Sequence, residues 1–319
     1  MCRRISVSSI FPMICLSLFA ASATAAEDWH KETVVYKTVG PTKIEADIYR
    51  RNGDQTRPCV VWIHGGALIM GSRQGVPGDI RKLCNDQNYV LVSLDYRLAP
   101  EVQLPAIIED LKDAFRWIHS EGVSKYHMDP KRILVAGGSA GGYLTLMSGI
   151  CVTPRPKALL AYYGYGDIDA PWYTDPSEHY RKQPLVTREE ALSVVGGEVK
   201  TEGVGRDRGK YYLYLRQNGL WTREVAGLDP KTERDKITPY CPVRNLSPDY
   251  PPTMLLHGTA DTDVAYHESA DMAAGLAKQG VWHELITLEG AEHGLGGGDP
   301  KALAAANARA MQFIREQLD

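Results

Sequence analysis

Short runs of consecutive hydrophobic residues, bounded by turn-forming residues, recur along the chain. Runs of this length are typical of strands buried on both faces, as in a parallel sheet covered by helices. Two earlier segments alternate hydrophobic and polar residues around Gly40-Pro41, which favours an antiparallel hairpin. Together the patterns predict eight strands, at 33–39, 43–49, 59–63, 89–94, 132–136, 158–163, 253–256 and 282–288.

Helical patterns separate the last six predicted strands. The clearest helix places its hydrophobic residues at the i, i+3, i+4, i+7 spacing of a single apolar face. That face is formed by Leu104, Ile107, Ile108, Leu111, Phe115 and Ile118. Further helices are expected directly after Ser139, near 266–278 and near 301–318. The alternation predicts an α/β fold with an eight-stranded, mostly parallel sheet and helices on both faces.

One long insertion, residues 164–250, interrupts the alternation between the sixth and seventh strands. It contains no buried-strand run but many charges and aromatic residues, including Trp172, Tyr212 and Trp221. Insertions of this length are usually functional. We expect a cap over the carboxyl end of the sheet, with these rings overhanging the site. The alternative is that the rings form the cap's own core.

The first 25 residues have the pattern of an export signal. Arg3 and Arg4 precede an apolar run at 10–20, and Ala23-Thr24-Ala25 is a small-residue cleavage site. The run is shorter than the ~20 residues that a membrane-spanning helix needs. We therefore expect a secreted or periplasmic protein without a membrane anchor, with residues 26–319 as a single domain.

Composition narrows the function classes further. The 319 residues carry a formal charge of only −3, so a nucleic-acid partner is not expected. Export permits disulfides, but the sequence does not choose a pairing among Cys59, Cys84, Cys151 and Cys241. Neither Cys-x-x-Cys nor His-Glu-x-x-His occurs, so we expect no metal site. The oligomeric state stays open.

The strongest local motif is G-G-S-A-G at 137–141, directly after a predicted strand. In this G-x-S-x-G pattern the serine lies on a sharp strand-to-helix turn that exposes its hydroxyl above the sheet. A dinucleotide loop is excluded because Ser139 replaces the middle glycine, and a P-loop because no Gly-Lys-Ser/Thr ending follows. Ser139 is the candidate nucleophile.

A second motif, H-G-G-A at 64–67, follows the third predicted strand. Acyl transfer creates an oxyanion that backbone N–H groups must approach closely, which small residues permit. The candidate oxyanion hole comprises Gly65, Gly66 and Ala67, together with Ala140 after the nucleophile. For His64 we expect a structural role.

A serine nucleophile needs a base that is oriented by a buried acid. His293 lies in the glycine-flanked loop 290–294, just after the last strand, and is the candidate base. The loop after the seventh strand offers Asp261 and Asp263, at the strand end where sites collect in open sheets. We assign Asp261 as the acid, because Asp263 is closer to the next helix and better placed to cap it.

These motifs, taken in order, resemble those of the hormone-sensitive-lipase-like esterases of the α/β-hydrolase superfamily. The resemblance rests on H-G-G at 64–66, D-Y-R-L-A-P-E at 95–101, L-P-A at 104–106, E-D at 109–110, D-P-K-R at 129–132, G-G-S-A-G-G at 137–142, H-G-x-x-D-x-x-V at 257–264 and G-x-x-H-G at 290–294. It implies the α/β-hydrolase fold and a serine esterase with Ser139, Asp261 and His293 as its triad. Small secreted esterases of carbohydrate-linked acetyl or feruloyl groups share the layout.

Three departures limit what the resemblance implies. The family often has aspartate where this chain has Gly138, a third glycine where it has Ala67, and a helical N-terminal cap that this chain lacks. Because family caps shape the acyl pocket, substrate preference does not carry over. The expected function is hydrolysis of short-chain or carbohydrate-linked esters, a reaction of the triad that needs no cofactor. The alternatives are an amide or peptide hydrolase with the same triad and a non-catalytic binding module on the same fold.

Overall fold

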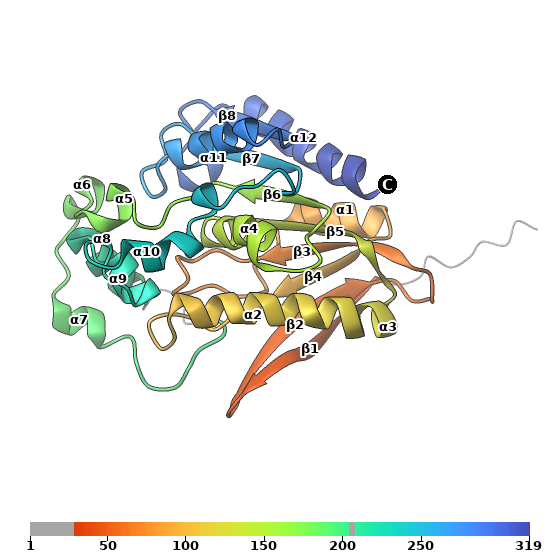
Figure 1. Ribbon diagram of the computed structural model, residues 1–319, viewed down its shortest axis with the longest axis horizontal. Coiled ribbons are helices and arrows are strands. Elements are labelled where there is room, and N and C mark those ends of the chain that lie inside the picture. Colours follow the sequence, from red (N-terminus) through yellow and green to blue (C-terminus); the bar gives the residue numbers. More distant parts are fainter. Residues whose placement is uncertain (1–28, 204–207) are drawn as a thin grey trace, which may run out of the picture.

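An eight-stranded sheet forms the centre of the computed structural model, which describes residues 29–203 and 208–319 (Figure 1). The strand order is β1-β2-β4-β3-β5-β6-β7-β8. β1, β2 and β4 pair antiparallel and the remaining neighbours pair parallel. The strands are β1 His30–Val39, β2 Thr42–Arg50, β3 Arg57–Ile63, β4 Val90–Leu94, β5 Met128–Gly138, β6 Ala158–Tyr162, β7 Thr253–Gly258 and β8 His283–Leu288. The predicted mostly parallel sheet is confirmed, whereas the predicted export signal lies outside the described residues.

Helices cover both faces of this sheet, which explains why every residue of β3, β4, β6 and β7 is buried. Residues of α1 (Gly78–Asp86) and α12 (Pro300–Leu318) form one core with alternate strand residues such as Val60 and Leu134. On the other face lie α2 (Leu104–Trp117), α4 (Ala140–Cys151) and α11 (His267–Lys278). A π-helical turn, η1 (Ile118–Gly122), extends α2 into α3 (Val123–Tyr126). The alternation of strand residues between two cores is the pattern of a doubly wound sheet.

Residues 164–250, here called the cap, connect β6 to β7 and contain no strand in their described part. Its helices group together beyond one end of the sheet (Figure 1). They are α5 Pro171–Thr174, α6 Glu178–Arg181, α7 Arg188–Leu192, α8 Arg208–Asn218, α9 Trp221–Ala226, α10 Arg234–Ile237, η2 Thr238–Tyr240 and η3 Pro242–Arg244. Trp221 is fully buried, stacks on Tyr173 at 3.9 Å and donates from Nε1 to the Ala67 carbonyl at 3.1 Å. This ring therefore ties the cap to the loop after β3.

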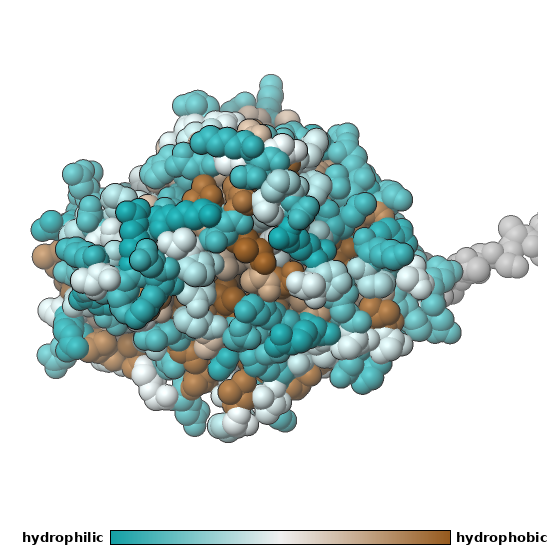
Figure 2. Space-filling view, in the orientation of Figure 1, coloured by the Kyte–Doolittle hydropathy of each residue, from teal (hydrophilic) through white to brown (hydrophobic). Residues whose placement is uncertain are grey.

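The face in Figure 2 is mostly hydrophilic, with hydrophobic residues gathered in smaller patches. In residues 29–203 and 208–319, no helix has the length and apolar character needed to cross a membrane. Cys59, Cys84, Cys151 and Cys241 are all free thiols, so none of the pairings that the sequence left open is formed.

Candidate active site

Ser139 lies on the sharp turn between β5 and α4. Its φ of 57° and ψ of −124° are rare for a residue with a side chain. Glycines make the turn possible: a Cβ at Gly137 would lie 2.4 Å from the Gly141 carbonyl oxygen, and one at Gly141 would lie 2.0 Å from that of Ile63. The motif is thus required sterically, and it presents the hydroxyl of Ser139 to a pocket.

Three loops at the carboxyl ends of the strands bring Ser139, His293 and Asp261 together. His293, in η4 (His293–Leu295) after β8, has its Nε2 3.0 Å from Ser139 Oγ. Its Nδ1 lies 2.8 Å from Oδ2 of Asp261, in the loop after β7. A carboxylate only accepts, so Nδ1 carries the proton, and Nε2 is left to accept from the serine hydroxyl. This is the arrangement that activates a serine for nucleophilic attack.

Asp261 is held on both of its oxygens. Oδ1 accepts from the backbone N–H groups of Asp263 and Val264, at 2.9 and 2.8 Å. Oδ2 accepts from His293 and lies 3.3 Å from Nε2 of the buried His257. Burial alone would raise the pKa of this carboxyl, but the hydrogen bonds from the two histidines hold it well below its usual range. Asp261 is therefore ionised at neutral pH and fixes the imidazole of His293.

The pKa of His293 is raised above its ordinary value. Burial alone would lower it, but the hydrogen bond to Asp261 and the negative charge of Asp263 outweigh burial. The ring of Tyr163 packs edge-on against the imidazole, with centroids 4.9 Å apart. The imidazole of His293 thus lies between two carboxylates and one aromatic ring.

The loop after β3 forms one wall of the pocket that contains Ser139, a cavity of about 420 Å³. Gly65, Gly66 and Ala67 all line it. Gly66 has a φ of +109°, and a Cβ there would lie 2.2 Å from the Met70 carbonyl oxygen. A Cβ at Gly65 would lie 2.7 Å from the Gly138 carbonyl oxygen, so the loop can lie this close to the turn of Ser139 only because its residues are small.

Backbone N–H groups near Ser139 are free to act on a ligand. Within the described chain, the amides of Gly66 and Ala67 donate no backbone hydrogen bond. Ala140 is the first residue of α4, where a helix leaves the N–H groups without internal partners. All four predicted oxyanion-hole residues therefore lie in the wall of the pocket or in the helix turn that begins beside Ser139.

His64 is buried and holds the conformation of this loop. Its Nδ1 donates to the Gly65 carbonyl oxygen at 2.7 Å, and its ring stacks on Tyr96 at 4.3 Å. Burial lowers the pKa of His64 to about 4, so the ring is neutral at physiological pH. These contacts agree with the structural role expected from the sequence.

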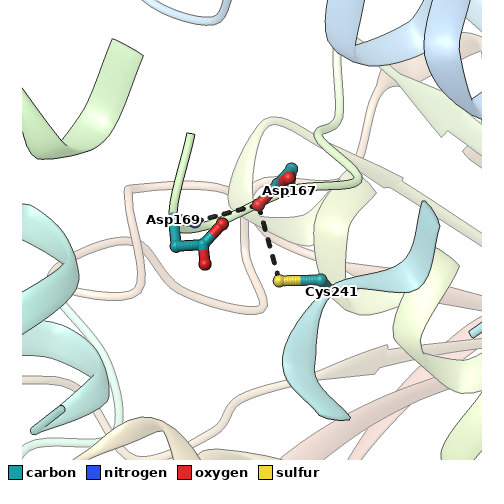
Figure 3. A group of neighbouring side chains, drawn as sticks. All are labelled: Asp167, Asp169 and Cys241. Carbon is teal, nitrogen blue, oxygen red and sulfur yellow. Dashed lines mark hydrogen bonds between the residues drawn. The ribbon is translucent and has the colours of Figure 1, made fainter. Parts of the chain in front are cut away.

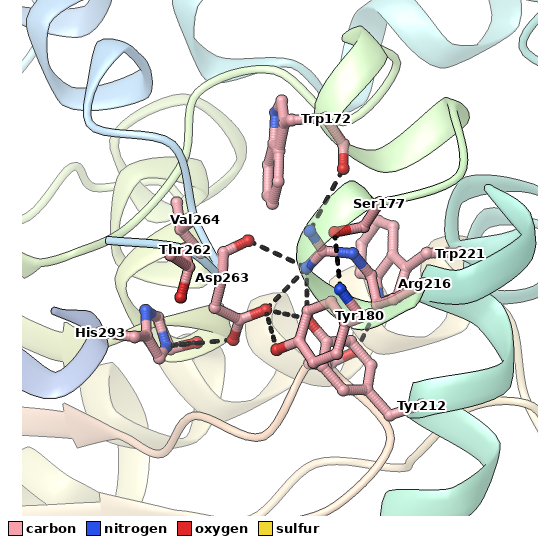
Figure 4. A network of polar contacts seen from close by, with 12 residues as sticks. Trp172, Ser177, Tyr180, Tyr212, Arg216, Trp221, Thr262, Asp263, Val264 and His293 are labelled. Atoms are coloured by element: carbon pink, nitrogen blue, oxygen red, sulfur yellow. Dashed lines mark hydrogen bonds and ion pairs between the residues drawn. The ribbon is translucent and has the colours of Figure 1, made fainter. Parts of the chain in front are cut away.

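Asp263 does not act as a helix cap, contrary to the interpretation favoured by its position. Its Oδ1 accepts from Arg216 Nη1 at 2.6 Å, from Tyr180 Oη at 2.9 Å and from Tyr212 Oη. Its Oδ2 lies 3.4 Å from Nε2 of His293 (Figure 4). The cap supplies all three donors, and no sequence motif marks them.

The aromatic residues of the cap differ in their relation to the pocket. Only Tyr212 of the three singled out from the sequence lines it, whereas Trp221 belongs to the buried core and Trp172 lines a separate cavity with Arg216. The remaining aromatic walls are Trp62 and Tyr163, from β3 and the end of β6. The expectation of overhanging rings thus holds for Tyr212 alone.

Three potential metal ligands in the cap, Asp167, Asp169 and Cys241, lie within 4.8 Å of one another (Figure 3). Arg244 binds both carboxylates, at 2.6 Å from Asp167 Oδ2 and 2.9 Å from Asp169 Oδ2, and Arg234 lies 3.2 Å from Asp169 Oδ2. Burial raises the pKa of the Cys241 thiol to about 12, so the thiol is protonated. The group is a salt-bridge network around Arg244.

Curated relatives are similar in sequence to parts of this chain. A non-reducing polyketide synthase of Stereocaulon alpinum is 25% identical over 311 residues, which cover 86% of this chain and 12% of that protein. The carboxylic ester hydrolase LipN of Mycobacterium tuberculosis is 35% identical over 130 residues, 40% of this chain and 34% of LipN. The match therefore spans 12% of the length of the polyketide synthase and 34% of the length of LipN.

Solved structures share the fold. An acetyl ester-xyloside bifunctional hydrolase of Caldicellulosiruptor lactoaceticus matches 89% of this chain and 96% of its own, with a TM-score of 0.64 and 18% identity. Residues 60–296, which include Ser139, Asp261 and His293, match the family described as the alpha/beta hydrolase fold. The fold and family implied by the sequence motifs are confirmed, and the chain belongs to the α/β-hydrolase fold family.

Proposed function

We propose that the protein is a serine hydrolase that cleaves carboxylic esters through an acyl-enzyme, with Ser139 as nucleophile, His293 as base and Asp261 as the orienting acid. One observation carries the proposal. His293 spans the 3.0 Å to Ser139 Oγ and the 2.8 Å to Asp261 Oδ2 with its two ring nitrogens. The identity to a carboxylic ester hydrolase over 130 residues supports ester chemistry.

The geometry supports the following sequence of steps. Nε2 of His293 takes the proton from Ser139 Oγ as Oγ bonds to the ester carbonyl carbon, and the carbonyl oxygen becomes an oxyanion. The oxyanion collapses, the C–O bond to the alcohol breaks, and Nε2–H gives its proton to the departing alkoxide. A water molecule, deprotonated by Nε2, then attacks the acyl-enzyme, and the carboxylic acid leaves as Oγ regains a proton.

Oxyanion stabilisation is assigned to the backbone N–H groups of Gly66, Ala67 and Ala140. Donors of this kind are each worth ~10²–10³ in rate. The orientation of the loop is supported by His64 on one side and by the Trp221 bond to the Ala67 carbonyl on the other. The cap thereby contributes to the chemistry through the position of the loop.

The substrate class is an ester of a short acyl chain or of a carbohydrate. The pocket of about 420 Å³ is lined by glycines as well as by Trp62, Tyr163 and Tyr212, which supports a small ester beside flat aromatic rings. No cofactor takes part in the proposed steps.

The experiment compares p-nitrophenyl acetate and butyrate with the corresponding p-nitroanilides. The proposal expects hydrolysis of the esters with a pre-steady-state burst of p-nitrophenol, and little or no cleavage of the anilides. Preferential cleavage of the anilides would assign an amide hydrolase, and turnover of neither class would favour a non-catalytic protein.

Export is a separate proposal, based on residues 1–25 alone. The pattern of residues 1–25 supports a mature protein that begins near residue 26 and acts outside the cytoplasm. The test is the N-terminal sequence of the protein recovered from a secreting host. An unprocessed N-terminus in the cytoplasmic fraction would contradict it.

A further inference from the structure

Asp263 places a carboxylate oxygen in the pocket beside the base. Its Oδ2 lies 3.4 Å from Nε2 of His293, and its side chain borders the same cavity as Ser139. The side chain of the nearer acid, Asp261, is fully buried and already bound to His293 on the other ring nitrogen. The site therefore contains a second carboxylate that the steps of ester hydrolysis do not use.

The two oxygens of Asp263 have different surroundings. Oδ1 accepts three hydrogen bonds, from Arg216, Tyr180 and Tyr212, which fill its acceptor capacity and fix the plane of the carboxylate (Figure 4). Oδ2 accepts no hydrogen bond from any described residue, and the side chain is 18% exposed. One oxygen is thus anchored, and the other lies beside His293 without a hydrogen-bond donor in the described part of the chain.

The charge of this carboxylate is already balanced. The Arg216 guanidinium is 3% exposed and lies within 5.7 Å of the ring centroids of Trp172, Tyr173, Tyr180 and Tyr212. It also donates to the backbone carbonyl oxygen of Asp263 at 2.9 Å. A carboxylate paired with a buried guanidinium favours a neutral hydrogen-bond donor over a second cation.

The position of Oδ2 relative to the reaction defines which part of the substrate it meets. Nε2 of His293 delivers its proton to the oxygen of the leaving alcohol, so that oxygen must lie close to Nε2. Because Oδ2 is 3.4 Å from the same nitrogen, it lies beside the alcohol part of the ester. A hydroxyl group on the carbon next to the ester-bearing carbon can reach it.

We propose that Asp263 is a specificity-determining residue that accepts a hydrogen bond from a free hydroxyl of the alcohol part, so that the preferred substrates are monoesters of vicinal diols, as in partly acylated polyols and sugars. The inference rests on the proposed ester hydrolase function. Arg216 and Tyr212, the two donors of α8, are positioning residues that hold Oδ1 and thereby aim Oδ2.

The test compares three butyrate esters that differ only in the alcohol. 2-Hydroxyethyl butyrate carries the donor, 2-methoxyethyl butyrate has a similar electronic effect but no donor, and propyl butyrate matches the size. We expect kcat/KM of the wild type to be ~10-fold higher for the 2-hydroxyethyl ester than for the other two, the effect of one hydrogen bond to a charged acceptor. Equal values for the 2-hydroxyethyl and 2-methoxyethyl esters in the wild type overturn the proposal without any variant.

The matched variants are Asp263→Asn and Tyr180→Phe. In Asp263→Asn the three donors retain the amide oxygen at the anchored position and leave an NH₂ group facing the pocket, which cannot accept. The 2-hydroxyethyl preference should then fall to about parity, while Tyr180→Phe, which leaves Oδ2 in place, should keep it. Each ratio is taken within one variant, so a general loss of activity or stability cancels. A preference that persists in Asp263→Asn overturns the proposal.

Two further outcomes separate the rival explanations. Butyrylcholine is compared with 3,3-dimethylbutyl butyrate, its uncharged counterpart, and we expect no preference between them. A choline preference that disappears in Asp263→Asn would overturn the hydroxyl assignment in favour of a cation. If the wild type hydrolyses none of these esters, nor p-nitrophenyl butyrate, the proposed function itself fails, whereas hydrolysis of all of them at equal rates leaves that function intact and refutes only the role of Asp263.

Discussion

Arg216 donates to Asp263 across 2.6 Å, and this bond joins α8 of the cap to the loop that also carries Asp261. Arg216 is enclosed by aromatic rings and Asp263 faces His293. The pair therefore links the cap to the loop beside His293. Removing it should lower the free energy of unfolding and shift the pKa of His293.

The stability prediction uses Arg216→Met. Breaking a buried pair while leaving one charge unpaired costs ~3 kcal/mol or more of the free energy of unfolding. Adding Asp263→Asn should recover part of that loss, because the unpaired charge is removed. Urea unfolding followed by circular dichroism measures both. The surface pair of Arg309 with Glu284 is the control, and Arg309→Met should cost no more than about 1 kcal/mol. Equal costs for the two arginines would contradict a structural role for the buried pair.

The pH dependence of kcat/KM for p-nitrophenyl butyrate should reflect the raised pKa of His293. The base acts in its neutral form, so a raised pKa moves the rising limb of the profile to a pH above the ordinary histidine value of ~6.5. The charged or titratable groups that face the imidazole are Asp261, Asp263 and Tyr163, with Arg216 behind Asp263.

Two variants should move this limb in opposite directions. Asp263→Asn removes a negative charge that favours the imidazolium, so the limb shifts to lower pH. Arg216→Gln removes a positive charge that opposes it, so the limb shifts to higher pH. Profiles of kcat/KM from pH 5 to 9 for the wild type and both variants measure these shifts. A flat wild-type profile would argue against a histidine base.

The two aspartates of the loop after β7 should differ sharply in their effect on simple esters. Asp261→Asn leaves His293 without the acceptor that fixes its tautomer, an effect of ~10⁴ on kcat. Asp263→Asn should cause a far smaller loss with p-nitrophenyl butyrate, whose alcohol part has no hydroxyl group beside the ester. Steady-state kinetics of both variants compare them directly, and the opposite ranking would transfer the acid role to Asp263.

The nucleophile turn should tolerate no side chain at Gly141. A Cβ there would meet the Ile63 carbonyl oxygen at 2.0 Å, and backbone cannot move aside cheaply. Overpacking of this kind costs ~1–3 kcal/mol or more. Gly141→Ala should therefore lower the urea midpoint, whereas Gly209→Ala in α8, where a Cβ meets nothing within 4 Å, should leave or raise it. Equal midpoints for the two variants would refute the steric argument.

Local sequence patterns predicted the sheet. They also predicted three residues whose side chains meet in the site, Ser139, Asp261 and His293. The buried strands contain continuous apolar runs, such as 59–63 in β3 and 158–162 in β6, and Ser139, Asp261 and His293 each follow a strand within a short glycine-containing motif. Because the carboxyl ends of parallel strands share one edge of a sheet, their loops converge even when they are far apart in sequence.

Contacts made by the cap could not be predicted in the same way. Arg216 and Asp263 are 47 positions apart, and Trp221 and Ala67 are 154 apart. Arg216 lies in α8, whose eleven residues show no clear apolar stripe, and the other α-helices of the cap are only four to six residues long. The contacts of Asp263 depend on tertiary packing, so its position near the start of α11 suggested a helix-capping role that the structure does not show.

The most direct test of the central claim is covalent labelling of the intact protein with diisopropyl fluorophosphate, followed by peptide mass spectrometry. If Ser139 is an activated nucleophile, its Oγ displaces fluoride and gains one diisopropylphosphoryl group, and ester hydrolysis is lost in proportion to labelling. Ser139→Ala should fold, remain unlabelled and lose ~10⁶ in kcat. Labelling at another residue, or full activity in the Ser139→Ala protein, would contradict the assignment of Ser139 as the nucleophile.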